Sequence, residues 1–151
     1  MKVKVITNLE FEDEILIQCK NITPEIQRVI DLLENQNKKI ECSDINNQKF
    51  YINPIDVLYI ESIDGTTYIY TSDKIGKTRS SLQELEEEYS TADYFRGAKN
   101  LIVNIQHIDS LKSQLNGRII VTLDNQEMLV ISRHYARLFK QKLKGEQHEK
   151  I

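Results

Sequence analysis

Short strand-like segments separated by turn dipeptides constrain the fold of this chain more than any other feature. Apolar, aromatic and β-branched stretches such as VLYIES, TTYIYTS and LIVN recur from residue 40 onward. The pairs Asp64-Gly65, Asn116-Gly117 and Asp124-Asn125 stand between such stretches. Residues of the first kind favour strands, and Asp-Gly and Asn-Gly favour hairpin turns. The chain is therefore predicted to be mostly β with few helices, an α+β fold built from antiparallel sheets.

Length and composition allow one ordinary core and a small appended element. With 151 residues and 40% hydrophobic content, two independent enzymatic domains would not fit. No apolar run approaches the roughly 20 residues that a helix needs to cross a bilayer. Acidic residues follow the start MKVKVIT where a signal peptide would continue its apolar stretch. We expect a soluble, cytoplasmic protein in which Cys19 and Cys42 are reduced.

The first 37 residues are predicted to form a strand-helix extension. Residues 2–7 alternate polar and apolar side chains, as a half-buried strand does, and residues 14–19 would be the hairpin partner. Thr23 and Pro24 then suit the cap and first turn of a helix. Residues 38–145 are predicted to form one β-rich module, and residues 146–151 a frayed tail.

Two serines mark helix starts within the β-rich module. Ser81 is followed three residues later by Glu84, which forms a capping-box pattern. Ser132 is expected to cap a final helix that ends near Gly145.

Charge is divided unevenly along the chain. Residues 96–151 contain 10 Lys and Arg against 5 Asp and Glu, or +5, whereas residues 1–95 contain 10 against 18, or −8, for a total of −3. Attraction to phosphates depends on the field of a local patch rather than on net charge. The charge distribution therefore allows a nucleic-acid contact in an acidic protein.

The final helix is predicted to carry cations on one face. Arg133, Arg137, Lys140 and Lys144 fall at spacings of four, three and four, which stacks them on one side. A plain amphipathic helix with cations near its negative end would show the same pattern. Arg133 directly follows the cap, so it would lie at the helix entry, where a guanidinium could reach guanine edges.

Two loops are further candidates for cationic contacts. Arg96, Lys99 and Asn100 precede an apolar strand, and Gly97 allows an irregular backbone between them. A charged loop that keeps a strand soluble would look the same. The small polar turn at residues 64–67, with Lys77 and Arg79 on a later strand, is a third candidate.

Catalytic patterns are weaker. His107, His134 and His148 form no helical metal pair, the cysteines form no CxxC motif, and no Gly-rich phosphate loop follows a strand. Ser132 and His134 lie two residues apart, so on a helix they point in different directions. We predict no enzyme activity, no metal site and no cofactor.

The order of these segments resembles the LytTR DNA-binding domain family, in the form of a stand-alone regulator without a receiver domain. The resemblance spans about residues 38–144 and depends on FRGAKNLIVN followed by SRHY. It implies an antiparallel β fold that binds promoter DNA by inserting loop residues into grooves. A receiver domain of about 100 residues would not fit before residue 38, so phosphorelay input through this chain is not expected.

The resemblance also implies roles for individual residues. Thr67, Lys99 and Arg133 would lie near the bases. The phosphate contacts would be Lys77, Arg79, Arg96, Asn100, His134, Arg137 and Lys140. Asn100 stands where the family pattern has a small hydroxyl residue, and Gly97-Ala98 replaces a bulkier pair, so base preference is not assigned.

The sequence therefore predicts a bacterial, sequence-specific transcriptional regulator that binds double-stranded DNA. The alternative is a β-rich protein-interaction domain without nucleic-acid binding. The apolar stripe Ile26, Val29, Ile30 and Leu33 would serve either a homodimer or packing within the monomer, and both remain open. Only the resemblance suggests control by a membrane protein.

Overall fold

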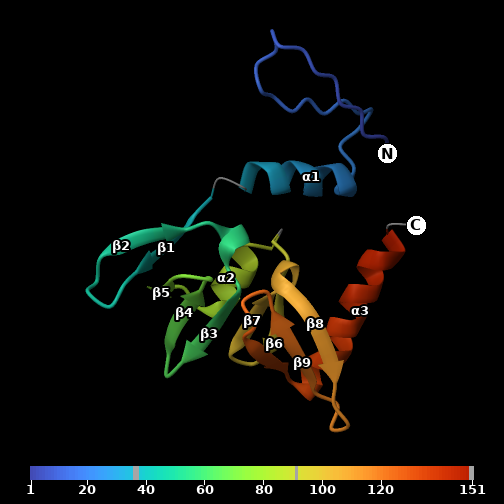
Figure 1. Cartoon of the computed structure of the whole chain (residues 1–151). Coiled ribbons are helices and arrows are strands. Elements are labelled where there is room, and N and C mark those ends of the chain that lie inside the picture. The colour runs from blue at the N-terminus through green and yellow to red at the C-terminus, as the bar shows by residue number, and fades with distance from the viewer. Residues whose placement is uncertain (36–37, 91, 150–151) are drawn as a thin grey trace.

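The computed structural model describes residues 1–35, 38–90 and 92–149. Its first helix, α1 (Pro24–Asn35), begins where the sequence predicts a helix, because the Thr23 hydroxyl accepts the Ile26 amide at 3.3 Å. The N-terminal segment and α1 lie above the sheets in Figure 1.

Within the described residues, ten strands form two antiparallel sheets, so the predicted mostly β, α+β fold is confirmed. The seven-stranded sheet has the order β2-β1-β5-β4-β3-β7-β6 and the three-stranded sheet the order β10-β9-β8. The first sheet contains β1 (Ile40–Ser43), β2 (Lys49–Ile52), β3 (Tyr59–Ile63), β4 (Thr66–Tyr70), β5 (Ile75–Thr78), β6 (Tyr94–Ala98) and β7 (Leu101–Asn104). The second contains β8 (Ile108–Ser113), β9 (Ile119–Leu123) and β10 (Met128–Ile131).

The larger sheet is covered on both faces, and its side chains alternate between two cores. Ile60 and Ile69 pack with the helix α2 (Leu82–Glu88) on one face. Tyr59 and Val103 face the other way, toward the three-stranded sheet and the helix α3 (Arg133–Glu149), where Phe139 is fully buried. Tyr59 also links the two sheets, because its hydroxyl donates to the Glu127 carboxylate at 2.8 Å.

Asp64-Gly65 and Asn116-Gly117 both lie in hairpin turns as predicted, but the loop around Asn116-Gly117 is longer than two residues. Asp64 and Gly65 have φ angles of 49° and 80°, which is the left-handed backbone of a type I′ hairpin turn. Asn116-Gly117 also lies in a hairpin, but the strands separate earlier than a two-residue turn requires. Residues 114–118 form the loop, which is closed by a hydrogen bond of 2.8 Å from the Gln114 amide to the Arg118 carbonyl.

Both serines that were predicted to cap helices lie directly before helices. The Ser81 hydroxyl accepts the Glu84 amide at 3.1 Å at the start of α2. α3 begins directly after Ser132, but it runs through Gly145 to Glu149. The prediction that Gly145 ends this helix is therefore wrong.

The two predicted N-terminal strands do not form. Residues 2–7 and 14–19 are extended or irregular and pair with no strand of the described chain. Val3 and Val5 are 88% and 80% exposed. Alternation is necessary for a half-buried strand but does not supply a partner, and an isolated two-stranded hairpin is marginal in water. The extension is therefore a helix with a non-strand segment before it.

One segment that was predicted to be a loop forms a strand. Residues 94–98 form β6 at the edge of the larger sheet, so Arg96 lies within a strand, and only Lys99 and Asn100 form the turn to β7. Gly97 produces an irregularity as predicted, because the pairing register shifts between Arg96 and Ala98. This bulge lets the strand bend without leaving the sheet.

Candidate nucleic-acid interface

Two hairpin turns of the larger sheet lie side by side. The β3–β4 turn follows Ser62, and Ser62 donates its amide to the Asn100 carbonyl in the β6–β7 turn at 2.9 Å. Lys99 and Asn100 are both exposed. The turns are distant in sequence, yet this hydrogen bond places them at the same edge of the sheet.

The start of α3 is attached to the same hairpin. The Ser132 amide donates to the Gly97 carbonyl at 2.8 Å. A Cβ atom at Gly97 would come within 2.6 Å of Ile131 Cδ1, so the two segments are in close contact. β6 is an edge strand with a bulge at Gly97, and its Gly97 carbonyl receives the amide of Ser132, the residue directly before Arg133.

The β8–β9 loop lies against Arg133. A Cβ atom at Gly117 would be 2.9 Å from Arg133 Cγ. We call the combined region the tip surface: residues 63–66, 98–101, 114–118 and 132–134. Lys99 and Arg133 both belong to it, and the β3–β4 and β8–β9 turns both point to the lower edge of the molecule in Figure 1.

Thr67 does not belong to the tip surface. Its side chain is only 5% exposed, because position 67 shares its face of β4 with the buried Ile69. The structure therefore does not support Thr67 as a base contact. Strand alternation could have shown this from sequence, since the exposed positions of the turn are Asp64 and Gly65, with Thr66 half-buried.

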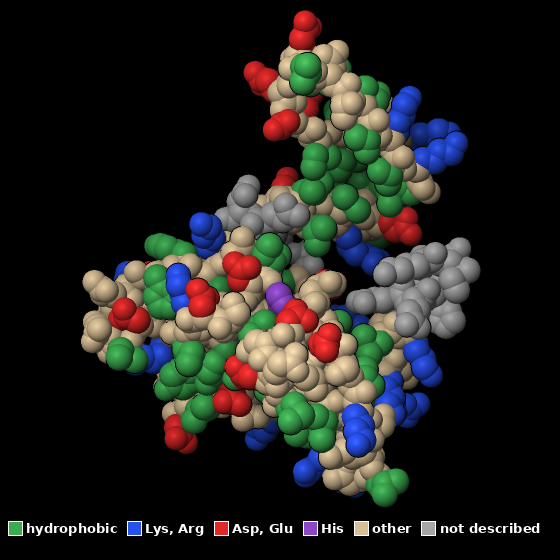
Figure 2. Space-filling model, viewed as in Figure 1, with side chains coloured by type: hydrophobic (Ala, Val, Ile, Leu, Met, Phe, Trp, Pro, Cys, Tyr) green, Lys and Arg blue, Asp and Glu red, His purple; other side chains and the backbone are tan. Residues whose placement is uncertain are grey.

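Arg133 stands between two grooves. One is lined by Asn116, Arg118 and His134 together with Arg133. The other runs along α3, and its basic side chains are Arg133, Arg137, Lys140 and Lys144. Figure 2 shows Lys and Arg side chains gathered over α3 and at the tip of the β8–β9 hairpin. The predicted basic face of the last helix is therefore continuous with the tip surface.

Lys77 and Arg79 lie on the side of the β3–β4 hairpin that is opposite Lys99, because β5 pairs with β4 and β7 pairs with β3. They line a groove across β5 and β1 that also includes Gly65 and Thr66 of the β3–β4 turn. Arg79 is exposed and Lys77 half-buried. Lys39 and Lys49 line the same groove, and Lys49 is paired with Glu41 at 3.2 Å.

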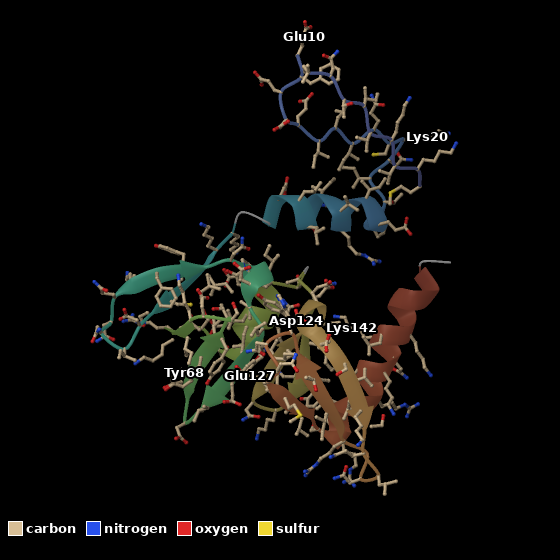
Figure 3. All side chains as sticks on the ribbon, viewed as in Figure 1. Glu10, Lys20, Tyr68, Asp124, Glu127 and Lys142 are labelled. Carbon is tan, nitrogen blue, oxygen red and sulfur yellow. The ribbon has the colours of Figure 1, made fainter. Side chains whose placement is uncertain are left out.

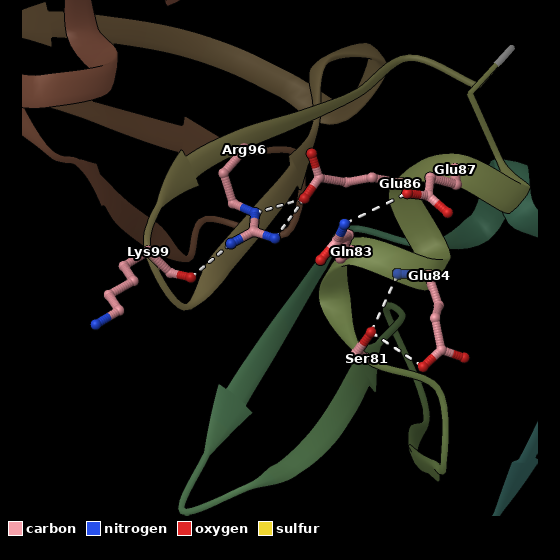
Figure 4. Close-up of polar contacts among 7 residues, drawn as sticks. All are labelled: Ser81, Gln83, Glu84, Glu86, Glu87, Arg96 and Lys99. Atoms are coloured by element: carbon pink, nitrogen blue, oxygen red, sulfur yellow. Dashed lines mark hydrogen bonds and ion pairs between the residues drawn. The ribbon is translucent and has the colours of Figure 1, made fainter.

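Arg96 differs from the other predicted contacts, because its guanidinium already has protein partners. It forms an ion pair with Glu86 of α2, and Nη1 donates to the Lys99 carbonyl at 2.6 Å. Figure 4 shows this arrangement, with the Lys99 side chain directed away from it.

Two residues of the tip surface, Asn116 and Arg118, have no sequence signal beyond that of a hairpin. Both are exposed and lie beside Arg133. Their proximity to Arg133 depends on the contact between the β8–β9 loop and α3. No local sequence pattern signals that contact.

Acidic side chains lie away from the tip surface on the three-stranded sheet. Asp124 and Glu127 flank the β9–β10 turn, at the opposite end of β9 from Arg118. Figure 3 labels both, together with Glu10 and Lys20 of the N-terminal segment. This separation gives the sheet a positive end and a negative end.

Within the described residues, no cluster of three His, Cys, Asp or Glu side chains could hold a metal ion. His107 has structural partners: one ring nitrogen lies 2.6 Å from the Ile55 carbonyl and the other 2.9 Å from the Asp124 carboxylate. Burial alone lowers the pKa of His107, but these acceptors outweigh it and the pKa is raised.

Residues 47–144 match the family model of the LytTr DNA-binding domain. The chain belongs to the LytTR family. Members are DNA-binding transcriptional regulators rather than enzymes, and the match includes Lys99, Arg133 and both grooves around Arg133.

Relatives of this LytTR protein are of two sizes. It is 27% identical over 145 residues to an uncharacterized HTH-type transcriptional regulator of Staphylococcus aureus, covering 95% of this chain and 98% of that protein. It is 24% identical over 113 residues to the sensory transduction protein LytR of Staphylococcus haemolyticus, covering 75% of this chain. The match spans only 44% of that LytR.

A solved structure shows the same fold. The LytTr DNA-binding domain of a Bacillus cereus protein superposes with a TM-score of 0.66 at 25% identity, covering 70% of this chain and 95% of that domain. In this LytTR protein, α2 and α3 are separated by five strands, so these two helices form no helix-turn-helix pair. No helix among the described residues is long and apolar enough to span a membrane.

Proposed function

We propose that this LytTR protein is a cytoplasmic, sequence-specific regulator that inserts side chains of the tip surface into the grooves of promoter DNA. DNA binding itself follows from family membership. The observation that carries the proposal is the pair of backbone hydrogen bonds, Ser62 to Asn100 and Ser132 to Gly97, which join two hairpin turns and the start of α3 at one edge of the molecule.

Lys99 and Arg133 are the proposed base contacts. Both side chains are exposed, Lys99 on the β6–β7 turn and Arg133 at the start of α3. Each of these elements is narrow enough to enter a DNA groove. The Arg133 guanidinium could bond a guanine edge with two parallel hydrogen bonds, worth about 1–3 kcal/mol of discrimination. In the β3–β4 turn, the half-buried Thr66 is the proposed contact in place of the buried Thr67.

The other predicted contacts, apart from Arg96, are proposed to contact phosphates. Arg137 and Lys140 follow Arg133 along one groove, and His134 faces the other. Asn100 lies beside Lys99, and Lys77 and Arg79 continue the surface beyond the β3–β4 turn. Contacts of this kind set the register of the protein on the duplex, whereas base contacts supply specificity.

Selection of bound duplexes from a random DNA pool tests the proposal directly. A defined motif should emerge, and its affinity should depend steeply on salt. If about six cations meet phosphates, the plot of log affinity against log salt should have a slope near −5. Failure to enrich any motif, together with salt-independent binding, would favour the alternative of a protein-interaction domain.

We also propose that the N-terminal extension pairs two copies of the chain. Leu9, Phe11, Ile15 and Leu16 are all more than half exposed, and exposed apolar patches of this kind mark interaction sites. The S. aureus relative matches nearly the whole chain, including this extension.

Sedimentation velocity of the full chain at micromolar concentration tests the pairing. A dimer is expected, and Leu16→Glu should convert it to a monomer. Lys20→Glu, an exposed change in the same segment, serves as the control and should leave the dimer intact. A monomeric wild type would remove the pairing proposal and leave the DNA proposal standing.

A further inference from the structure

The guanidinium of Arg96 links α2 to the turn that carries Lys99. Its Nε donates to Glu86 Oε1 at 2.7 Å, and Nη2 forms an ion pair with the same carboxylate. Its Nη1 donates to the Lys99 carbonyl at 2.6 Å. All three nitrogens therefore have acceptors within the protein, and the side chain is only 22% exposed.

The turn held by Arg96 is fixed at a second point. The Asn100 carbonyl accepts the Ser62 amide at 2.9 Å. The carbonyls of both turn residues are thus engaged, one by α2 through Arg96 and one by β3. The Lys99 side chain extends outward from this braced turn (Figure 4).

The strand of Arg96 also supports the start of α3. Gly97, the next residue, gives its carbonyl to the Ser132 amide, and Arg133 follows Ser132. A displacement of β6 would therefore move Lys99 and Arg133 relative to each other. The hairpin that contains Arg96 sets the spacing between the two proposed base contacts.

We propose that Arg96 is a positioning residue for sequence readout, acting through Glu86, and not a phosphate contact. The inference rests on the proposed function, because it assumes that Lys99 meets DNA. A turn that is already ordered loses less conformational freedom on binding, so bracing strengthens the specific complex. Loose non-specific binding, which depends on phosphate charge, gains little from it.

Glu86→Gln tests the proposal by the sign of its effect. Removing a negative charge from a DNA-binding protein should raise its affinity for DNA if charge alone matters. If Glu86 orients Arg96, the same change should instead weaken binding to the selected duplex by about fivefold or more. Binding to a shuffled duplex of equal length should stay within about twofold.

Glu87→Gln is the matched control, because it makes the same charge change at the next position of α2. Glu87 is exposed, and its carboxylate accepts a hydrogen bond from the Gln83 side chain at 3.4 Å. This variant should bind both duplexes as tightly as wild type or slightly more tightly. A rise in affinity for both Glu86→Gln and Glu87→Gln would overturn the positioning role.

Arg96→Lys separates positioning from phosphate contact. Lysine keeps the charge but cannot reproduce the planar fork that reaches Glu86 and the Lys99 carbonyl together. We expect a loss of specific affinity similar to that of Glu86→Gln, with the salt slope unchanged. Wild-type affinity in Arg96→Lys, with a slope reduced by about one in Arg96→Gln, would identify a phosphate contact instead.

The readout is the ratio of specific to shuffled affinity, measured where thermal melts show each variant to be folded. Partial unfolding lowers both affinities equally and leaves the ratio unchanged, so a loss of stability cannot imitate the result. Lys99→Ala tests the underlying function separately. If Lys99→Ala leaves the ratio at the wild-type value, the proposed base contact fails. If Lys99→Ala lowers the ratio but Glu86→Gln does not, only the positioning role fails.

Discussion

The Ser132 amide donates to the Gly97 carbonyl at 2.8 Å. This hydrogen bond anchors the start of α3 to the bulge in β6, an edge strand of the seven-stranded sheet. Through this hydrogen bond Arg133 takes its position beside the β6–β7 hairpin. Gly97 has no side chain, which permits β6 to lie close to Ile131 and Ser132.

Gly97→Ala should therefore destabilise the protein. The added Cβ would meet Ile131 Cδ1 at 2.6 Å, and Ile131 is fully buried. Overpacking of this kind costs about 1–3 kcal/mol, measurable by urea unfolding. Ile131→Val removes the obstructing methyl group, so the double variant should be more stable than the sum of the two single effects. Strict additivity would contradict the proposed contact.

Arg133→Ala and Lys140→Ala should have different effects on DNA binding, the first on base discrimination and the second on affinity for any duplex. Arg133→Ala should reduce discrimination between the selected motif and its single-base variants by about 1–3 kcal/mol at one position. Lys140→Ala should weaken binding to all duplexes alike and reduce the salt slope by about one unit. Binding titrations at several salt concentrations measure both effects. Lys20→Ala, in the N-terminal segment, is the control and should change neither, whereas equal effects of the first two variants would refute the division of roles.

Thr67→Val should leave DNA affinity within about twofold of wild type, because the buried side chain cannot reach a base. Asp64→Asn, at the exposed turn before it, should raise affinity for all duplexes by removing a negative charge near phosphates. Titration against the selected and shuffled duplexes compares the two. A large loss of specificity in Thr67→Val would restore Thr67 as a contact.

Stability should fall as pH rises through the titration of His107. Both ring nitrogens face acceptors, the Ile55 carbonyl and the Asp124 carboxylate, and only the protonated ring donates to both. The pKa of His107 is raised above its usual 6.5: burial opposes the rise, and hydrogen bonds to Ile55 and Asp124, with the nearby charges of Asp124 and Asp56, outweigh it.

A raised folded pKa means that the stabilisation is complete below the unfolded value and is lost as pH passes through the folded value. Urea unfolding from pH 6 upward should show this decline, at pH values chosen to span about two units above 6.5. His107→Gln should flatten it, and Asp124→Asn should shift it to lower pH. An identical decline in His107→Gln would assign the effect to another group.

The sequence by itself determined the local elements of this protein. Turn preferences placed the hairpin at Asp64-Gly65, because the left-handed backbone there suits these two residues. Hydroxyl caps placed the helix starts after Thr23 and Ser81, since those bonds involve neighbours three residues away. The family resemblance, confirmed by the match over residues 47–144, added the fold and DNA binding.

Only the tertiary structure decided which side chains share the tip surface. Residues 2–7 have a strand pattern but no strand, since a strand needs a partner that the pattern does not contain. Arg96 resembled a loop cation, yet its charge is occupied by Glu86 from another element. The segments that carry Lys99, Arg133 and Asn116 are brought together by the Ser132–Gly97 hydrogen bond and by the packing of Gly117 against Arg133. Such contacts depend on how the two sheets pack, and no local spacing encodes that packing.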